Sequence, residues 1–102
     1  MTLLGQDVLT RSAKRNKPLR AWLESWVTDV VNAEWHAIGD VRKMYPAADG
    51  VPLTSRTVVT VFNVKGNDFR LLTWIDYMAG IVQVLDVMTH AEYSKDLWKM
   101  RY

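Results

Sequence analysis

The sequence predicts an α+β domain in which a short N-terminal strand and helices pack on an antiparallel β meander, followed by a C-terminal helix. Three observations lead to this prediction. Apolar residues recur at helical spacing in the first half of the chain. β-Branched residues between short turns dominate after residue 56. A helix-capping pattern then appears near residue 90. We therefore expect a single domain over residues 1–102, with its helices on one face of the sheet.

The N-terminal half begins with a short strand expected over residues 1–4 and a helix expected over residues 6–15. Pro18 suits the first residue of a second helix, because proline is tolerated where no helical N–H bond is needed. This second helix is the clearest element of the chain. Its apolar residues follow the i, i+3, i+4 pattern: Leu19, Trp22, Leu23, Trp26, Val27 and Val30.

A third, short helix is expected from about His36 to Met44, where Tyr45-Pro46 should stop it. The segment Asp49–Pro52 is expected to be a loop, because aspartate, glycine and proline favour turns over regular structure.

Three strands are predicted next. They cover Val58–Val64, Phe69–Tyr77 and Ile81–Met88, with turns at Lys65–Asp68 and Met78–Gly80. Such short turns make the three strands an antiparallel meander.

A final helix is expected to start at Thr89. Glu92 stands three residues later, and the two together form a capping box. Trp98 is expected to pack this helix back on the sheet.

Composition excludes several classes of site. The chain has no cysteine, so it has no disulfide, thiolate metal site or cysteine nucleophile. His36 and His90 are far apart in sequence, which argues against a histidine-rich metal site, and we expect no metal or cofactor. No signal peptide is visible, and no apolar run approaches the ~18 residues that span a bilayer. We expect a cytoplasmic protein with no membrane partner.

The formal net charge is only +2, but the basic residues cluster near the N-terminus. No acidic residue interrupts the run Arg11, Lys14, Arg15, Lys17 and Arg20. Such a cluster suits a polyanion, and it is equally typical of a solvated helix end and loop.

The meander should gather polar residues at one end of the sheet. If Lys65–Asp68 closes the first hairpin symmetrically, Asn63 faces Arg70 and both project from the same face. The third strand returns beside the second, so His90 comes next to the start of that strand. Pairing therefore predicts a group made of Asn63, Lys65, Arg70 and His90.

This group matches the needs of metal-free RNA cleavage, in which the ribose 2′-OH attacks the adjacent phosphate. The reaction requires a base, an acid and cations that stabilise the phosphorane. His90, at the N-terminus of an anion-attracting helix, can be the acid or the base. Tyr93 can orient it or contact the nucleotide, Arg70 and Lys65 can bind the phosphate, and Asn63 the ribose or a base edge.

Each residue also has an ordinary structural alternative. His90 can be a surface residue at a helix start, and Arg70 can pair with Asp68 or Glu92. A lysine in a turn is usually solvated, a tyrosine such as Tyr93 often belongs to a core, and an asparagine before a turn often forms it.

Two segments resemble motifs of the HigB-type toxins of the RelE-like superfamily. Residues 61–71 (VFNVKGNDFRL) resemble the F-N-x-x-G-N-x-x-R-L stretch of that family, and residues 87–93 (VMTHAEY) resemble its closing T-H-x-x-Y motif. The resemblance implies a RelE-like fold and an mRNA interferase, an endoribonuclease that usually acts on translating ribosomes and inhibits translation. It also implies a HigA-type antitoxin with a helix-turn-helix domain. In the toxin–antitoxin complex, only the antitoxin would contact operator DNA.

By this resemblance, Arg70, His90 and Tyr93 are expected to be catalytic, and Asn63 and Asn67 to bind substrate. Lys65 departs from the family pattern and is expected only to help bind RNA.

Two other functions stay open at this point. A non-catalytic RNA-binding domain would use the same basic surface without cutting. A protein-interaction module would instead use the apolar residues of the second helix as an interface.

Overall fold

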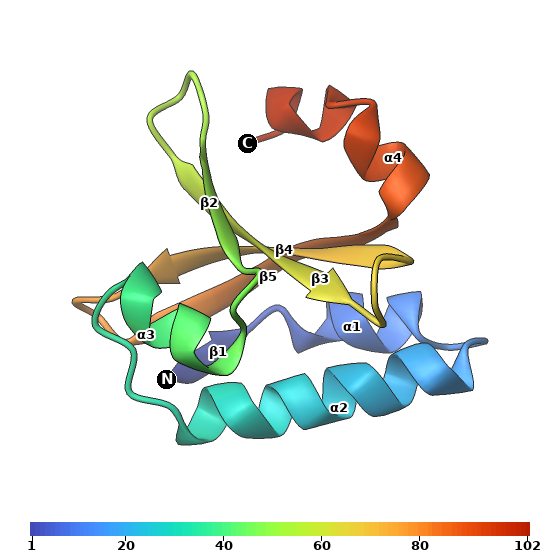
Figure 1. Cartoon of the computed structure of the whole chain (residues 1–102), viewed down its shortest axis with the longest axis horizontal. Coiled ribbons are helices and arrows are strands. Elements are labelled where there is room, and N and C mark those ends of the chain that lie inside the picture. The colour runs from blue at the N-terminus through green and yellow to red at the C-terminus, as the bar shows by residue number, and fades with distance from the viewer.

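The computed structural model describes all of residues 1–102 and contains four α-helices, one 3₁₀ helix and five strands (Figure 1). The strands form one mixed sheet in the order β1-β5-β4-β3-β2. The α+β class and the RelE-like layout predicted from the sequence are confirmed. In chain order the elements are β1 (Thr2–Leu4), α1 (Gln6–Ser12), α2 (Lys17–Asn32), α3 (Ile38–Met44), β2 (Asp49–Pro52), β3 (Val58–Val64), β4 (Phe69–Asp76), β5 (Ile81–Thr89), α4 (His90–Ser94) and the 3₁₀ helix η1 (Leu97–Met100).

The sheet extends beyond the predicted meander on both sides. β3, β4 and β5 pair antiparallel as expected, and β1 adds to β5 in parallel, with Leu3 opposite Val82. The prediction of a loop at Asp49–Pro52 was wrong, because this segment is strand β2, paired antiparallel with β3. Apart from Val51 its residues are poor strand formers, and they are held by hydrogen bonds to β3 at an edge of the sheet, where proline is tolerated.

One face of the sheet is covered by α1 and α2, which lie below it in Figure 1. The apolar stripe of α2 faces the sheet, where Trp26 and Phe62 meet edge-on with ring centroids 5.5 Å apart. Asn16 caps this helix, since its side-chain oxygen accepts a hydrogen bond from the Leu19 N–H at 3.0 Å. No helix of the chain is both long and apolar enough to cross a membrane.

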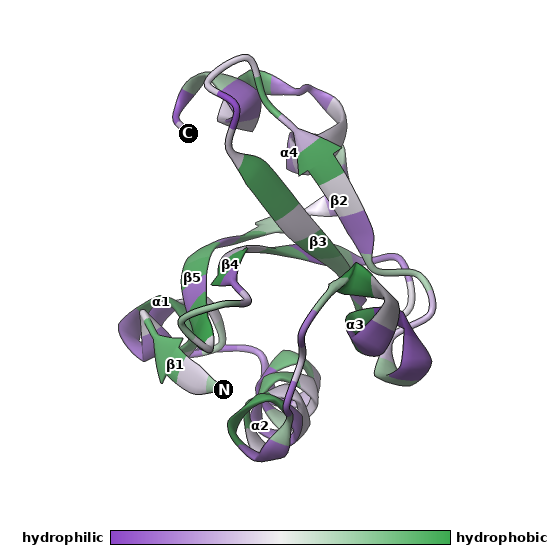
Figure 2. Cartoon of the chain, turned by 90° about the vertical axis from the view of Figure 1, so that its left-hand side faces the viewer, coloured by the Kyte–Doolittle hydropathy of each residue, from purple (hydrophilic) through white to green (hydrophobic).

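The opposite face is covered by α4 and η1, so the expectation that all helices share one face was wrong. Figure 2, the view from the side, shows α2 and α4 on opposite sides of the strands. The reason is the strand β3, whose residues are apolar on both faces and therefore need cover on both. A buried cluster fills the space under η1: Leu53, Val59, Val61, Leu72, Met88 and Trp98.

Trp98 packs on the sheet as expected, but from η1 rather than from the helix that Thr89 begins. α4 ends at Ser94, and Asp96 then adopts a left-handed conformation with φ of 60° that turns the chain into η1. Only 1% of the Trp98 side chain is exposed.

Replacing Trp98 by alanine is expected to lower the free energy of unfolding by about 3–5 kcal/mol, because it removes the largest side chain of that cluster. Leu97→Ala, at a neighbouring residue that is 61% exposed, is the control and should change stability by less than about 1 kcal/mol. Urea unfolding followed by circular dichroism measures both. Equal effects of the two substitutions would contradict the packing described here.

Candidate functional site

The polar residues at one end of the sheet are placed by the β3–β4 hairpin. Val64 pairs with Phe69 and Asn63 with Arg70, as the sequence predicted. The four-residue turn is closed by two successive residues with positive φ, Lys65 at 50° and Gly66 at 70°. Asn63 and Arg70 therefore project from one face, which is the face that α4 and η1 cover.

The start of α4 is tied to this turn. The backbone N–H of His90 donates a hydrogen bond to the Asp68 carbonyl at 3.1 Å, and Arg70 lies opposite Met88 in the sheet. The Thr89 hydroxyl caps α4 by accepting a hydrogen bond from the Glu92 N–H at 3.2 Å, which confirms the predicted cap. The hairpin turn and the leading end of the terminal helix are thus neighbours.

Arg70 is the centre of the site. Its side chain is buried, with 8% of the residue exposed, and its Nη1 donates hydrogen bonds to the carbonyls of Asn67 at 3.2 Å and Phe69 at 3.0 Å. The guanidinium carbon lies 5.6 Å from the centroid of the Tyr93 ring. No carboxylate pairs with it, and its remaining nitrogen atoms have no protein partner and are not sealed from solvent.

Tyr93 is held between Arg70 and Trp98. Its ring stacks on Trp98 with centroids 5.3 Å apart and an interplanar angle of 16°, and the indole N–H donates to the Tyr93 carbonyl. Burial raises the pKa of Tyr93, the negative charge of Asp49 raises it further, and the positive charge of Arg70 opposes both. The phenol is therefore neutral at physiological pH and keeps a proton that it can donate in a hydrogen bond.

Asp49 is the site residue that sequence reasoning missed. It pairs with Val61 in the sheet, so its carboxylate projects on the same face as Tyr93, and it also lies 3.8 Å from Arg42. Because the segment reads as a loop, nothing in its spacing pointed to this position.

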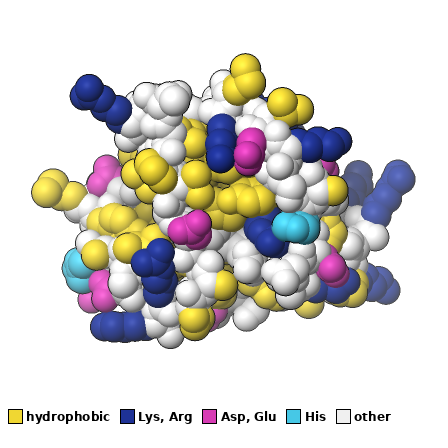
Figure 3. Space-filling view, turned by 45° about the horizontal axis from the view of Figure 1, so that its top comes forward, with side chains coloured by type: hydrophobic (Ala, Val, Ile, Leu, Met, Phe, Trp, Pro, Cys, Tyr) yellow, Lys and Arg dark blue, Asp and Glu magenta, His cyan; other side chains and the backbone are white.

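The remaining predicted residues are more exposed. His90 is exposed at the first position of α4. Lys65 Nζ lies 3.9 Å from Asp68 Oδ2, an ordinary surface ion pair, and Asn67 reaches Arg70 through its carbonyl. Figure 3 shows a histidine beside a cationic side chain, next to a strip of hydrophobic side chains. No three histidine, aspartate or glutamate side chains gather as a metal site would require.

A family model described as HigB toxin, RelE-like toxic component of a toxin-antitoxin system, matches residues 19–96. The chain belongs to the HigB toxin family. The matched segment includes the β3–β4 hairpin, α4 and the site residues from Asp49 to Tyr93, and it ends before Trp98. No curated protein matches the chain. As the toxic component of a toxin-antitoxin system, this HigB toxin has an antitoxin as its partner.

The contact between Arg70 and Tyr93 can be tested by titration. In the HigB toxin, Tyr93 should ionise above the ordinary tyrosine pKa of about 10, and Arg70→Met should raise its pKa further because a neighbouring cation is removed. Ultraviolet difference titration against the Tyr93→Phe variant isolates this phenol from the other tyrosines.

Arg101→Met is the control for that titration, since Arg101 lowers the pKa of Tyr102 instead. It should leave the Tyr93 pKa unchanged. A Tyr93 pKa that does not respond to Arg70→Met would show that the two groups are apart in solution.

Proposed function

We propose that this HigB toxin is a metal-independent endoribonuclease that cuts mRNA on translating ribosomes in the cytoplasm and so inhibits translation. One observation carries the proposal. The Arg70 guanidinium is fixed by two backbone carbonyls, has no carboxylate partner, and stands at the end of the sheet where α4 begins with His90. A buried cation with free donors at the same end of the sheet as an exposed imidazole suits a phosphodiester in reaction.

Arg70 binds the scissile phosphate in this proposal. Its Nη1 already has two carbonyl partners, and its other nitrogen atoms remain for phosphate oxygens. As the 2′-oxygen bonds to phosphorus, negative charge grows on those oxygens, and a cation held in place stabilises it without reorganising.

His90 transfers the proton. Imidazole titrates near neutrality, and His90 is the only histidine near this end of the sheet. It takes the proton of the 2′-hydroxyl as the bond from phosphorus to the 5′-oxygen breaks, and the departing oxygen receives a proton from water or from a second donor of the site. The products are a 2′,3′-cyclic phosphate and a free 5′-hydroxyl.

The other residues position the RNA. The neutral phenol of Tyr93 contacts the nucleotide as a donor, and Asn63, on the same face as Arg70, bonds the ribose or a base edge. Lys65 and Asn67, exposed in the turn, hold the flanking strand. The antitoxin of this system is proposed to be a HigA-type helix-turn-helix protein, which alone would bring the pair to operator DNA.

The His90→Ala variant is expected to lose RNA cleavage by about 10²- to 10⁴-fold, the usual contribution of a proton-transferring side chain. His36→Ala is the matched control, because His36 is also an exposed histidine but lies just before α3. It should cleave like the wild type. Mapping of RNA ends with purified toxin, with and without translating ribosomes, measures both variants and the need for the ribosome.

Full cleavage by His90→Ala would remove His90 from the mechanism. If wild-type toxin binds RNA with a strong salt dependence but leaves it uncut on and off the ribosome, the protein is an RNA-binding domain and the nuclease proposal is wrong.

Arg70→Lys should lower the cleavage rate by about 10²-fold although it keeps the positive charge, because an ammonium cannot keep both carbonyl bonds and bind the phosphate with two parallel donors. Arg101→Lys, at an exposed arginine that pairs with Asp86, should have no effect. Thermal unfolding of both variants separates lost activity from lost fold. An Arg70→Lys variant with wild-type activity would show that charge alone suffices.

A further inference from the structure

We infer that the toxin holds a second segment of single-stranded RNA in a cavity at the opposite end of β3 and β4, with a base stacked on Trp74 and phosphates on Arg42 and Arg56. The inference rests on the proposed function, since it assigns more of the same RNA to a distant surface. The cavity has a volume of about 690 Å³ and lies between α3, the β2–β3 hairpin and the end of β4.

The cavity offers a base-stacking surface. Trp74 is 39% exposed, whereas the side chains of Trp26, Trp35 and Trp98 are buried in the core. An exposed indole in a concave site suits the flat face of a nucleobase, and stacking of this kind accepts any base.

The cavity is also cationic. Arg42 Nε donates to the Ala48 carbonyl at 2.9 Å, which fixes the guanidinium at the wall, and Arg56 stands in the hairpin loop with a positive φ of 70° and no ion pair. No aspartate or glutamate lines the cavity, and the nearest pairing carboxylate is Asp49, 3.8 Å from Arg42. Such walls attract a phosphate backbone.

Hydroxyl groups complete the lining. Thr57, Thr60 and Tyr77 contribute to the walls. Hydroxyl groups of this kind can hydrogen-bond a ribose or a base edge. Aromatic, cationic and hydroxyl groups together favour a nucleotide over an acidic peptide, which would not use the indole face.

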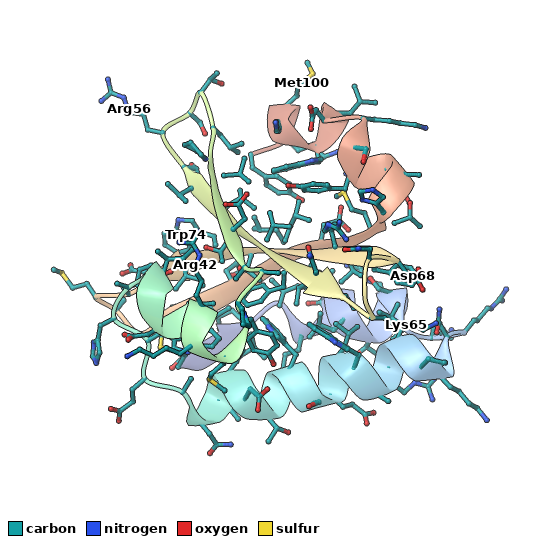
Figure 4. All side chains as sticks on the ribbon, viewed as in Figure 1. Arg42, Arg56, Lys65, Asp68, Trp74 and Met100 are labelled. Carbon is teal, nitrogen blue, oxygen red and sulfur yellow. The ribbon has the colours of Figure 1, made fainter.

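The position of the cavity allows one RNA strand to reach both sites. Figure 4 shows Arg42 and Trp74 at one end of the sheet, Arg56 at the tip of the hairpin, and Lys65 and Asp68 at the other end. β3 has seven residues, so its two ends lie about 20 Å apart, a span that a few nucleotides cover. The cavity would then hold RNA several nucleotides from the cut.

Binding of RNA that cannot be cut tests the inference apart from catalysis. A fluorescent 2′-O-methylated single strand lacks the attacking hydroxyl, so wild-type toxin binds it without cleaving it. Trp74→Ala should weaken this binding about 5- to 150-fold, and Trp74→Phe should restore most of it. A 2′-O-methylated dinucleotide is too short to reach both sites. Bound at the Arg70 site, it should have nearly the same affinity for both variants as for the wild type.

Two charge variants form a matched pair for the same measurement. Arg56→Gln and Arg15→Gln each lower the formal net charge from +2 to +1, but Arg15 lies in the N-terminal basic cluster. Arg56→Gln should reduce the slope of log binding constant against log salt concentration by about one, because one phosphate contact is lost, and Arg15→Gln should leave this slope unchanged. Cosedimentation of the Trp74→Ala variant with ribosomes tells which RNA occupies the cavity. If it is ribosomal RNA, the variant should bind ribosomes more weakly than the wild type. If it is messenger RNA, ribosome binding should be unchanged, and the variant should cleave long RNA with a higher KM.

Unchanged affinity of Trp74→Ala for the long strand, or equal effects of Arg15→Gln and Arg56→Gln, would overturn the inference. If Trp74→Ala instead weakens the antitoxin complex alone, the cavity is a protein-binding surface. Absence of cleavage by wild-type toxin, with these binding differences intact, would reject the nuclease proposal and leave the second RNA site standing.

Discussion

Both faces of the central strand β3 are apolar, and each must be shielded from water. On one side α1 and α2 provide the shield through a large core. On the other side the shield comes mainly from Trp98 of η1, with Leu53 beside it in the same buried cluster. The site follows from this second arrangement. Trp98 supports Tyr93, the Tyr93 ring lies against the Arg70 guanidinium, and the same packing keeps α4 beside the β3–β4 turn. The geometry of the candidate site thus follows from the need to cover this face of the sheet.

Arg70 is the only charged residue among the buried ones, and its partners are neutral. Carbonyl oxygens and an aromatic face compensate part of the cost of removing a cation from water, and they leave its charge uncancelled. A carboxylate partner would have stabilised the fold more simply, as Arg101 and Asp86 do on the surface, but would have filled the place of an anionic ligand. Arg70 therefore keeps its positive charge unpaired, at a cost in stability, and this is what the proposed phosphate contact requires.

Local rules predicted much of this structure. Turn lengths fixed the register that sets Asn63 opposite Arg70, and the capping box located the start of α4. The predictions that were wrong concern elements whose structure depends on tertiary contacts rather than on local sequence. Asp49–Pro52 is a strand because it pairs with β3 along its whole length. Trp98 reaches the other face of the sheet because the left-handed conformation of Asp96 turns the chain after the short helix α4. The influence of Asp49 on Tyr93 depends on that unpredicted strand. The residues expected to be catalytic came from pairing and family resemblance, and their roles remain proposals.

The parallel pairing of β1 with β5 joins residues 2–4 to residues 81–83, almost the full length of the chain apart. Contacts so distant along the chain form late, since the whole intervening segment must be ordered first. During synthesis, the first strand has no partner until nearly all of the polypeptide has left the ribosome, and α4 with its histidine emerges later still. The complete sheet, and with it the packing that places α4 beside the β3–β4 turn, can therefore form only after most of the polypeptide has been synthesised.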